Sequence, residues 1–358
     1  MPGRACVLKV LYAYRYGIVG GVSTQLRLRQ EALAKVNIEC QLFFSQDNGL
    51  RQVLSRPDGM HFGMDVSFGQ LVRNGRFDAV VVIDSPELLG PARGSLFRRN
   101  RVFLDVHTTT ATGLAYLNEV DVSSLAGVMV PTRYSEALVQ RRVPKASIEV
   151  VPNILDTGVF SPSGESRVES SGGTREFIWV GKLDNHKNWR LALVYARLLC
   201  DLFGDVKLHV VGGYTAPTER AEEFFQLAYR LGVSGRVSWL DRVENTTLAQ
   251  LYRQCAASGG AMLVTSRDES FGMAAAEALL CGCPLIANDL PVFREVFPES
   301  PLIHLVDIWQ PDQIAQAAQG LSQCAFEREV VTLHDELSRR YGPESFLASF
   351  KRLMSVSP

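Results

Sequence analysis

Two glutamates enclose a run of small residues in the second half of the chain, and together they could hold a phosphate-containing ligand. Glu269 lies in an expected loop, Gly272 opens the next helical stretch, and Glu277 follows within that stretch. A helix N-terminus presents unpaired N–H groups and a partial positive charge, which favour an anion. One carboxylate at each end of an elongated ligand, with phosphate between them, fits this spacing. Glutamates at such positions are also common without any function, and the spacing alone leaves both interpretations open.

Two lysines offer positive charge near another expected turn. Lys182 and Lys187 flank a turn between an expected strand and an expected helix. Ammonium groups at that spacing could clamp a diphosphate, because each is a compact point charge on a flexible stem. We expect both side chains in an exposed loop. The alternative is that two solvated lysines bind nothing.

A glycine loop and a histidine occupy corresponding positions in the first half. Residues 17–23 (GIVGGVS) follow the first expected strand and open a helix. Glycines there let the backbone approach a ligand closely. The dinucleotide fingerprint and the P-loop pattern are both missing, so a tight turn is the alternative. His107 follows the apolar residues 102–106, and in open α/β sheets ligands bind beyond the carboxyl ends of strands. We therefore expect His107 to point toward a cleft, with a structural histidine as the alternative.

Composition and missing motifs narrow the class of protein. The formal net charge of −1 and the 46% hydrophobic content are typical of a soluble globular protein and give no reason to expect nucleic-acid binding. The sequence contains no D-x-D pair, no G-x-S-x-G elbow and no H-E-x-x-H motif. We therefore expect neither a metal nor a cofactor.

The seven cysteines are scattered, and their odd number favours buried, reduced thiols. Cys281 and Cys283 have no second pair nearby that would complete a zinc site. We expect no signal peptide and no membrane-spanning helix, since no apolar run approaches ~18 residues. The expected location is the cytoplasm, with association on the cytoplasmic face of a membrane as an option.

Short β-branched runs alternate with helical patterns along the whole chain. The expected strands are residues 7–13, 40–44, 79–83, 102–106, 127–130 and 148–151, then 177–180, 207–211, 236–240, 261–264, 284–287 and 302–305. The expected helices include residues 23–35, 189–202, 218–231, 247–255 and 272–280. Such alternation indicates parallel sheets covered on both faces.

Two such series predict two doubly wound, Rossmann-like domains that face a cleft. A length of 358 residues suits two domains. Residues 161–174 are rich in Ser, Gly and Glu and are expected to form a linker or surface loop. Residues 343–354 have the apolar spacing of a helix that needs a partner. We assign residues 1–152 and 341–358 to the first domain and residues 153–340 to the second.

Charge is distributed unequally between the two halves. Residues 1–152 hold 18 Lys and Arg against 13 Asp and Glu, whereas residues 153–358 hold 19 against 25. The basic groups include Arg98, Arg99, Arg101, Arg141 and Arg142. A basic first domain favours an anionic ligand, or an anionic membrane that carries a lipid-linked ligand. The alternative is that these arginines only keep the protein soluble.

In their order, these segments resemble the retaining glycosyltransferases of family 4, which have the GT-B fold. Gly20 and Gly21 resemble the glycine loop of that family. Residues 130–135 (VPTRYS) resemble its V-P-S-x-x-S stretch. Residues 151–160 (VPNILDTGVF) resemble its hinge, V-I-P-N-G-V-D-x-x-x-F.

The second half carries the more specific motifs. Residues 181–183 (GKL) and 187–188 (KN) match G-R-L and K-N. Residues 269–278 (ESFGMAAAEA) match E-x-F-G-x-x-x-x-E-A, and residues 281–287 (CGCPLIA) match G-x-P-V-I-A. The resemblance covers nearly the whole chain.

The resemblance implies a role for each matching residue of the second domain. Lys182 and Lys187 would neutralise the donor diphosphate, and Glu277 would bind the nucleotide ribose. Glu269, with backbone N–H groups of Phe271 and Gly272, would hold hydroxyls of the donor sugar. The implied donor-binding residues are Gly21, Lys182, Lys187, Arg242, Val243, Ser270, Phe271, Gly272, Met273, Ala274 and Glu277.

The first domain would bind the acceptor and complete the catalytic set. His107 would line the reaction centre, and Gly21 would let its loop approach the donor and acceptor. The C-terminal helix would cross back to this domain. The implied catalytic residues are Glu269, His107, Lys182 and Lys187.

Three positions depart from the family pattern. Lys182 stands where Arg is usual, which loses bidentate geometry but keeps the charge. Asp241 stands where Gly is usual, and Ile154 departs from the hinge pattern. These departures leave recognition of the base open.

The implied reaction moves a hexose, with retention at the anomeric carbon, from a nucleotide diphosphate to an acceptor hydroxyl. A UDP-sugar is the expected donor, and a small molecule, a glycan or a lipid-linked sugar is the expected acceptor. No carboxylate is placed as a nucleophile, so we expect front-face attack without a metal. The alternatives are an inactive sugar-nucleotide-binding protein and a nicotinamide-dependent oxidoreductase.

Overall fold

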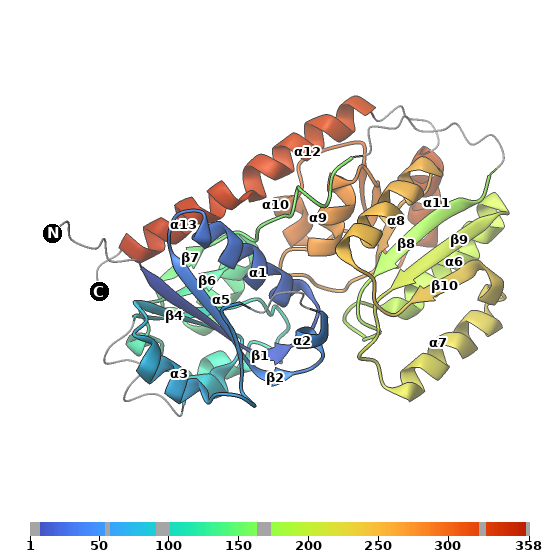
Figure 1. Cartoon of the computed structure of the whole chain (residues 1–358). Helices are drawn as coiled ribbons and strands as arrows, with labels where there is room; N and C mark the ends of the chain where they lie inside the picture. Colours follow the sequence, from blue (N-terminus) through green and yellow to red (C-terminus); the bar gives the residue numbers. More distant parts are fainter. Residues whose placement is uncertain (1–7, 54–57, 91–100, 163–172, 322–326, 356–358) are drawn as a thin grey trace. The chain divides into compact units, whose positions relative to one another are not determined.

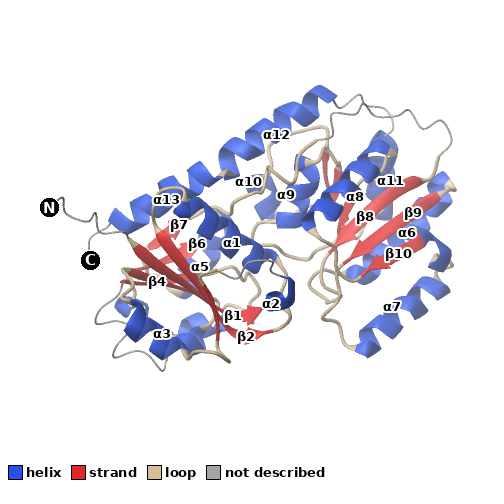
Figure 2. Ribbon diagram, viewed as in Figure 1, coloured by secondary structure: helices blue, strands red, loops and turns tan. Residues whose placement is uncertain are grey.

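The computed structural model describes residues 8–53, 58–90, 101–162, 173–321 and 327–355. The chain divides into two compact units (Figure 1). The first comprises Met1–Ile154 with Tyr341–Pro358, and the second comprises Leu155–Arg340. Each unit is built on a parallel sheet with helices along its faces (Figure 2).

The sheet of the first unit follows the order β3-β2-β1-β4-β5-β6-β7 within the described residues. Its strands are β1 (Lys9–Gly17), β2 (Glu39–Asp47), β3 (Met60–Phe62), β4 (Ala79–Ile83), β5 (Arg101–Asp105), β6 (Gly127–Val130) and β7 (Ile148–Val150). Every adjacent pair is parallel. The continuous apolar run of β4 is buried at every position, as expected for a central parallel strand.

The helical elements of the first unit are α1 (Gly21–Ala34), α2 (Leu50–Val53), α3 (Phe68–Gly75), α5 (Arg133–Arg142), α13 (Pro343–Ser355) and the 3-10 turns η1 (Pro86–Leu88), η2 (Ala115–Asn118) and η3 (Val122–Ser124). They connect the strands, except for α13, which returns from the end of the chain. Two hydrogen-bonded caps fix helix starts in this unit. The Ser67 hydroxyl accepts from the backbone N–H of Gln70 before α3, and Thr132 does the same for Ser135 at α5.

The sheet of the second unit has the order β10-β9-β8-β11-β12-β13 within the described residues. Its strands are β8 (Arg175–Val180), β9 (Val206–Val211), β10 (Val237–Leu240), β11 (Met262–Val264), β12 (Leu285–Asn288) and β13 (Ile303–Val306). All neighbours are parallel. In chain order this is 3-2-1-4-5-6, the doubly wound order of dinucleotide-binding folds.

The helical elements of the second unit are α6 (Trp189–Phe203), α7 (Thr218–Arg230), α8 (Asn245–Ala257), α9 (Met273–Leu280), α10 (Pro291–Val296), α11 (Pro311–Gly320), α12 (Glu327–Tyr341) and the 3-10 turn η4 (Ser234–Arg236). They again link successive strands, and α11 and α12 follow the last strand. Helix α6 buries residues at the spacing of one helical face, including Trp189, Leu193 and Ala196. Burial of that face fixes the turn that precedes it.

The last helix belongs to the first unit. Helix α13 lies beside α1 and β7 (Figure 1). Phe346 and Phe350 are buried in the first unit's core. Arg101 at the start of β5 donates to the carbonyl oxygens of Met354 (2.6 Å) and Leu353 (3.1 Å), so it holds the end of this helix. Arg101 therefore belongs to the fold rather than to a free basic surface.

The predicted fold class is confirmed as two Rossmann-like domains with a C-terminal helix that returns to the first. Strand β3 was not predicted, and neither were the helices α2, α3, α5, α10, α11 and α12. Arg98, Arg99 and residues 163–172 of the expected linker lie outside the described residues. Several expected bounds also differ by one or two residues from those observed, because strand and helix ends depend on pairing.

The packing of α13 predicts that Phe346→Ala destabilises the first unit. Removal of a fully buried phenylalanine ring typically costs about 3–5 kcal/mol. The four tryptophans all lie in the second unit, so their fluorescence in urea measures that unit alone. Hydrogen exchange should therefore accelerate in α1 and β5, while the fluorescence midpoint changes little. The exposed Lys351→Ala on the same helix serves as the control, and unchanged exchange in Phe346→Ala would contradict the packing argument.

Candidate functional site

The strand order of the second unit reverses between β8 and β11, and the loops after these strands lie side by side. The Arg267 N–H donates to the carbonyl of His186 (2.9 Å), which joins the two loops directly. The Thr265 hydroxyl contacts the carbonyl oxygens of Lys187 (2.9 Å) and Asn188 (3.1 Å). Such a switch point at the carboxyl ends of parallel strands is where open α/β sheets bind ligands.

The two predicted lysines have different environments in the loop after β8. Lys182 is exposed, as expected. Lys187 is partly buried, and its Nζ lies 2.5 Å from Oε1 of Glu269 in the loop after β11. The expectation that both lysine side chains are exposed is therefore wrong for Lys187. Its partner is 82 positions away in the sequence, so the loop spacing gave no sign of the pair.

Glu269 is held from two sides. Its side chain is 12% exposed, and the same Oε1 accepts a hydrogen bond from the Ser266 hydroxyl (2.7 Å). Ser266 is in turn fixed because its carbonyl accepts from the side-chain amide of Asn288 on β12 (2.8 Å). The carboxylate is therefore held by groups that lie on or directly after three neighbouring strands, β8, β11 and β12.

Helix α9 begins at a position that only glycine suits. Gly272, its N-cap residue, has φ 90°, and a Cβ there would lie 2.5 Å from Cε1 of Phe293. The first backbone acceptor of the helix is Gly272 itself, which receives the N–H of Ala276 (3.0 Å). No side chain caps the N-terminus and no acidic residue lies in its first turn. A helix start without a side-chain cap or an acidic residue favours an anion.

The flanking residues of this helix differ in burial. Ser270 is half-buried and Phe271 is 1% exposed, so the Phe271 ring anchors the loop in the core. Glu277 lies within α9 and is half-buried. Burial raises the pKa of the Glu277 carboxyl to about 8, and the negative charge of Asp156 adds to this effect. A carboxyl group with so high a pKa is a functional-site candidate.

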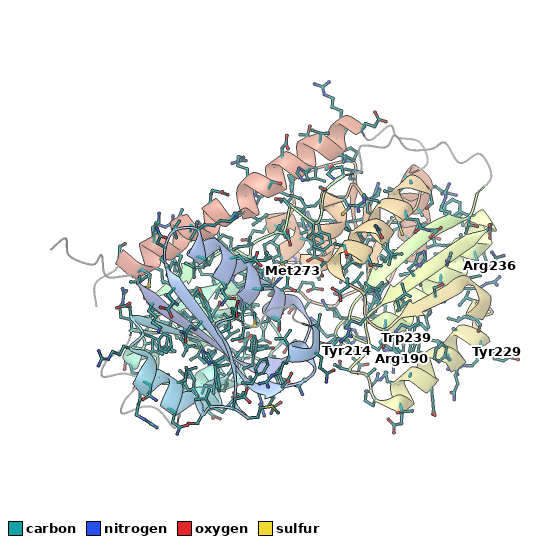
Figure 3. The ribbon with its side chains drawn as sticks, viewed as in Figure 1. Arg190, Tyr214, Tyr229, Arg236, Trp239 and Met273 are labelled. Atoms are coloured by element: carbon teal, nitrogen blue, oxygen red, sulfur yellow. The ribbon has the colours of Figure 1, made fainter. Side chains whose placement is uncertain are left out.

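The loops after β9 and β10 complete this edge of the second unit. Gly212 has φ 115°, and a Cβ there would lie 2.3 Å from the carbonyl oxygen of Gly181, so the two loops touch by their backbones. Arg242 is exposed and its guanidinium lies 5.9 Å from the ring centre of Tyr214. Val243 is half-buried beside it. Figure 3 labels Tyr214 and also Met273, which marks the start of α9.

The first unit carries a separate set of predicted residues. Gly21 is exposed at the start of α1, and no side chain caps that helix at Gly20. His107 follows β5, and its side chain is 8% exposed. Its Nε2 lies 3.1 Å from Oδ2 of Asp105, and its backbone N–H donates to Oδ2 of Asp84 (3.0 Å).

Asp84 and Asp105 are candidates that the sequence reasoning missed. Asp84 follows β4 with φ 38°, a left-handed conformation that is strained for a residue other than glycine. Tyr116 donates to its Oδ1 (3.0 Å). Burial raises the pKa of the Asp84 carboxyl to about 6. The available signal was an acidic residue at the end of each of two apolar strands.

The structure thus brings Lys187 together with Glu269 in the second unit, and His107 together with two aspartates in the first. The same sheet edge as the Lys187–Glu269 pair also carries Lys182 in the loop after β8, Arg242 in the loop after β10 and Glu277 in α9. The described cysteines are free thiols. Within the described ranges, no helix has both the length and the apolar character that crossing a bilayer requires.

Comparison with known proteins identifies similar sequences in the second unit. Residues 165–324 match the family model described as "Glycosyl transferases group 1". The D-inositol 3-phosphate glycosyltransferase of Geodermatophilus obscurus is 32% identical over 181 residues, which cover 48% of this chain and 39% of that protein. The phosphatidyl-myo-inositol mannosyltransferase of Mycobacterium tuberculosis is 29% identical over 173 residues, covering 48% and 43%. The match thus spans less than half the length of either relative.

Comparison with solved structures concerns the whole fold. HepE from Anabaena, solved in complex with UDP-glucose, superimposes with a TM-score of 0.79 at 16% identity, covering 98% of this chain and 100% of that one. Sucrose-phosphate synthase from Thermosynechococcus elongatus gives a TM-score of 0.75 at 16% identity, covering 97% and 98%. At this identity the likeness shows the fold, the GT-B arrangement of two Rossmann-like domains.

The raised pKa of Glu277 predicts how stability depends on pH. The carboxyl ionises at its ordinary pKa of 4.5 in the unfolded chain but at about 8 in the folded one. Between these values the folded state holds a proton that the unfolded state has lost. Stability therefore falls as pH rises, by up to about 1.4 kcal/mol per pH unit for this group.

Glu277→Gln removes this titration and keeps the shape of the side chain. Urea unfolding followed by tryptophan fluorescence should show the variant gaining on the wild type between pH 5 and pH 8, by about 1.4 kcal/mol per unit at most. Glu222→Gln, on the exposed face of α7, is the matched control. A stability difference that does not change with pH would contradict the buried, protonated carboxyl.

Proposed function

We propose that this chain is a retaining glycosyltransferase of family 4 that transfers a hexose from a UDP-sugar. The observation that carries the proposal is the Lys187–Glu269 pair beside the uncapped start of α9. It offers a cation, an anion acceptor and a carboxylate at one switch point, in the region that matches the group 1 family model. A nucleotide sugar has groups that complement all three.

The leaving diphosphate is the centre of the proposed mechanism. As the bond to the anomeric carbon breaks, negative charge builds on the diphosphate and positive charge on the sugar. Lys182, Lys187 and the N–H groups at the start of α9 stabilise the developing negative charge, and preorganised groups of this kind supply several kcal/mol. Glu269, with Phe271 and Gly272, binds the sugar hydroxyls.

The other residues of the second unit are assigned to the nucleotide. Glu277 accepts hydrogen bonds from the ribose hydroxyls. Arg242 and Val243 bind the base, supported by the contact of Arg242 with the Tyr214 ring. We propose Ser270, Met273 and Ala274 as further donor contacts because they surround the helix start.

The first unit is assigned to the acceptor, with His107 and Gly21 at the reacting end. No carboxylate is assigned as a nucleophile, so the acceptor hydroxyl attacks from the face of the leaving group and a phosphate oxygen takes its proton. The lysines supply the positive charge at the diphosphate, so the proposed reaction needs no divalent metal. Arg141 and Arg142 stay exposed at the end of α5 and support an anionic acceptor or anionic lipid nearby.

A binding screen followed by a turnover assay tests this function. Nucleotides, nucleotide sugars and NAD are compared by thermal shift, since a ligand of the folded state raises the unfolding temperature. Hydrolysis or transfer from the best donor is then followed by NMR in EDTA. Retained anomeric configuration is the expected result. Binding without turnover would favour an inactive sugar-nucleotide-binding protein, and stabilisation by NAD alone would favour an oxidoreductase.

Removal of the lysine charge predicts a specific loss of rate. Lys187→Ala should lower kcat/KM. The expected loss of transition-state stabilisation is roughly 2–4 kcal/mol, as for other charge-stabilising donors. Because this change also leaves Glu269 without its partner, the double variant Lys187→Ala/Glu269→Ala separates the lost cation from the orphaned carboxylate. Arg230→Ala, exposed on α7, controls for surface charge. Near wild-type turnover of Lys182→Ala/Lys187→Ala would refute the assignment.

The assignment of Glu277 to the ribose predicts proton release. Hydroxyl donors favour the ionised carboxylate, so nucleotide binding should lower the pKa of Glu277 from about 8 and expel a proton near pH 7. Titration calorimetry of UDP in two buffers of different ionisation enthalpy measures this release. The release should disappear in Glu277→Gln. An equal release in both proteins would mean that another group supplies the proton.

A further inference from the structure

An arginine and an aspartate form a buried ion pair inside the first unit. Arg29 on α1 and Asp105 at the end of β5 have side chains that are 1% and 0% exposed, and Nη1 lies 2.5 Å from Oδ2. Removal of two charges from water is costly, and attraction repays it only when the remaining polar groups are also satisfied. In the described residues Arg29 Nε, Arg29 Nη2 and Asp105 Oδ1 have no hydrogen-bond partner. Stability alone is therefore a poor reason for this pair.

Aromatic rings cover the guanidinium of Arg29. The ring centres of Tyr12 on β1 and Phe346 on α13 lie 5.7 and 5.4 Å from it. Helix α13, beside α1 in Figure 1, thus covers the charge pair on its outer side. The rings attract the cation through their faces and exclude the solvent that would screen the pair.

The same Asp105 oxygen also contacts the ring of His107. Oδ2 lies 2.5 Å from Arg29 Nη1 and 3.1 Å from His107 Nε2. Burial raises the pKa of the Asp105 carboxyl, but the neighbouring His107 and Arg29 lower it more, and the net pKa lies well below the ordinary value. Asp105 is therefore a carboxylate that can only accept hydrogen bonds.

An accepting carboxylate fixes which ring nitrogen of His107 carries hydrogen. Nε2 must be the donor, whether the imidazole is neutral or charged, so Nδ1 is the nitrogen at which the two states differ. The backbone of the same residue is held separately, because its N–H donates to Asp84 (3.0 Å). Two carboxylates thus hold His107, one through the ring and one through the main chain.

We propose that Asp105, balanced in charge by Arg29, is a positioning residue that keeps His107 in the Nε2–H tautomer and leaves Nδ1 to accept a substrate hydroxyl. The substrate in this statement rests on the proposed function. The tautomer does not rest on it, because it follows from the contacts of the free protein. A purely structural ion pair would impose no preference on the His107 ring.

The tautomer is measured directly in the full chain. Long-range ¹H–¹⁵N spectra of protein labelled in its six histidines distinguish Nε2–H from Nδ1–H in a neutral ring, and His107→Gln identifies the signal. Wild-type protein should show Nε2–H for His107. A predominant Nδ1–H form in the wild type would overturn the proposal without any variant.

Substitution tests the cause. Asp105→Asn keeps the shape but places an amide, which can donate, opposite the ring, so His107 should shift to the Nδ1–H form. Asp84→Asn is the matched control: it neutralises a carboxylate that binds the backbone N–H of His107 and not its ring, so the tautomer should stay. If Asp105→Asn fails to fold, Arg29→Lys serves as the second variant. It keeps the positive charge beside Asp105, so His107 should retain the Nε2–H tautomer. A tautomer unchanged in folded Asp105→Asn would refute the positioning role.

Turnover gives the second readout. Asp105→Asn should lower kcat by about 10–100-fold, by analogy with the partners that orient metal-binding histidines, and change the donor KM much less. Equal losses in kcat and in folded fraction would assign the pair to structure alone. If the wild-type tautomer is Nε2–H but no nucleotide sugar is turned over, the positioning stands and the proposed function fails.

Discussion

The hydroxyl group of Thr265 joins the three parts of the second unit that form its candidate site. Thr265 follows β11, and its Oγ1 accepts from the indole N–H of Trp179 on β8 (2.9 Å). The single proton of the same hydroxyl is shared between the carbonyl oxygens of Lys187 (2.9 Å) and Asn188 (3.1 Å) in the loop after β8. The side chain is buried, so water does not compete for these bonds. Together with the bond from the Arg267 N–H to the His186 carbonyl, this group holds the loop of Lys187 against the loop of Glu269.

The first unit reaches a comparable result with charge. There an aspartate lies at the end of β4 (Asp84) and another at the end of β5 (Asp105). Both aspartates bind His107. Asp84 adopts a left-handed backbone to do so, which stores strain at the sheet edge. Phe346 of the C-terminal helix covers the ion pair of Arg29 with Asp105. Helix α13 therefore takes part in the environment of His107.

The sequence predicted those features that depend on local pattern. The apolar run of β4 and the helical face of α6 are visible without any tertiary information. Strand β3 was missed because it has three residues and a polar histidine among them. Helix α12 was overlooked although Leu333, Leu337 and Tyr341 are buried at four-residue spacing, because the charged residues between them hide this stripe in the sequence. The two domains were predictable because strands and helices alternate regularly in both halves.

Long-range pairs could not be predicted in the same way. Arg29 and Asp105 are 76 positions apart, and an arginine on an expected surface helix is ordinarily solvated. Gln25 is similar, since its amide exchanges two hydrogen bonds with the backbone of Ile154, both 2.7 Å long and 129 positions distant. Such polar residues on the buried face of α1 conceal its amphipathic pattern. The assignment of individual residues to donor and acceptor remains a proposal that rests on the matched motifs.

The pairing of Lys187 with Glu269 bears on which anions the second unit accepts. In the free protein each charge neutralises the other, so a small anion such as inorganic phosphate meets a lysine that is already occupied. To bind the lysine, phosphate must separate a partly buried carboxylate from its cationic partner, which costs free energy. A ligand that brings both a phosphate for the lysine and hydroxyl donors for the carboxylate replaces both partners at once. On the proposed function, the ion pair therefore disfavours free phosphate relative to ligands that combine phosphate with a sugar.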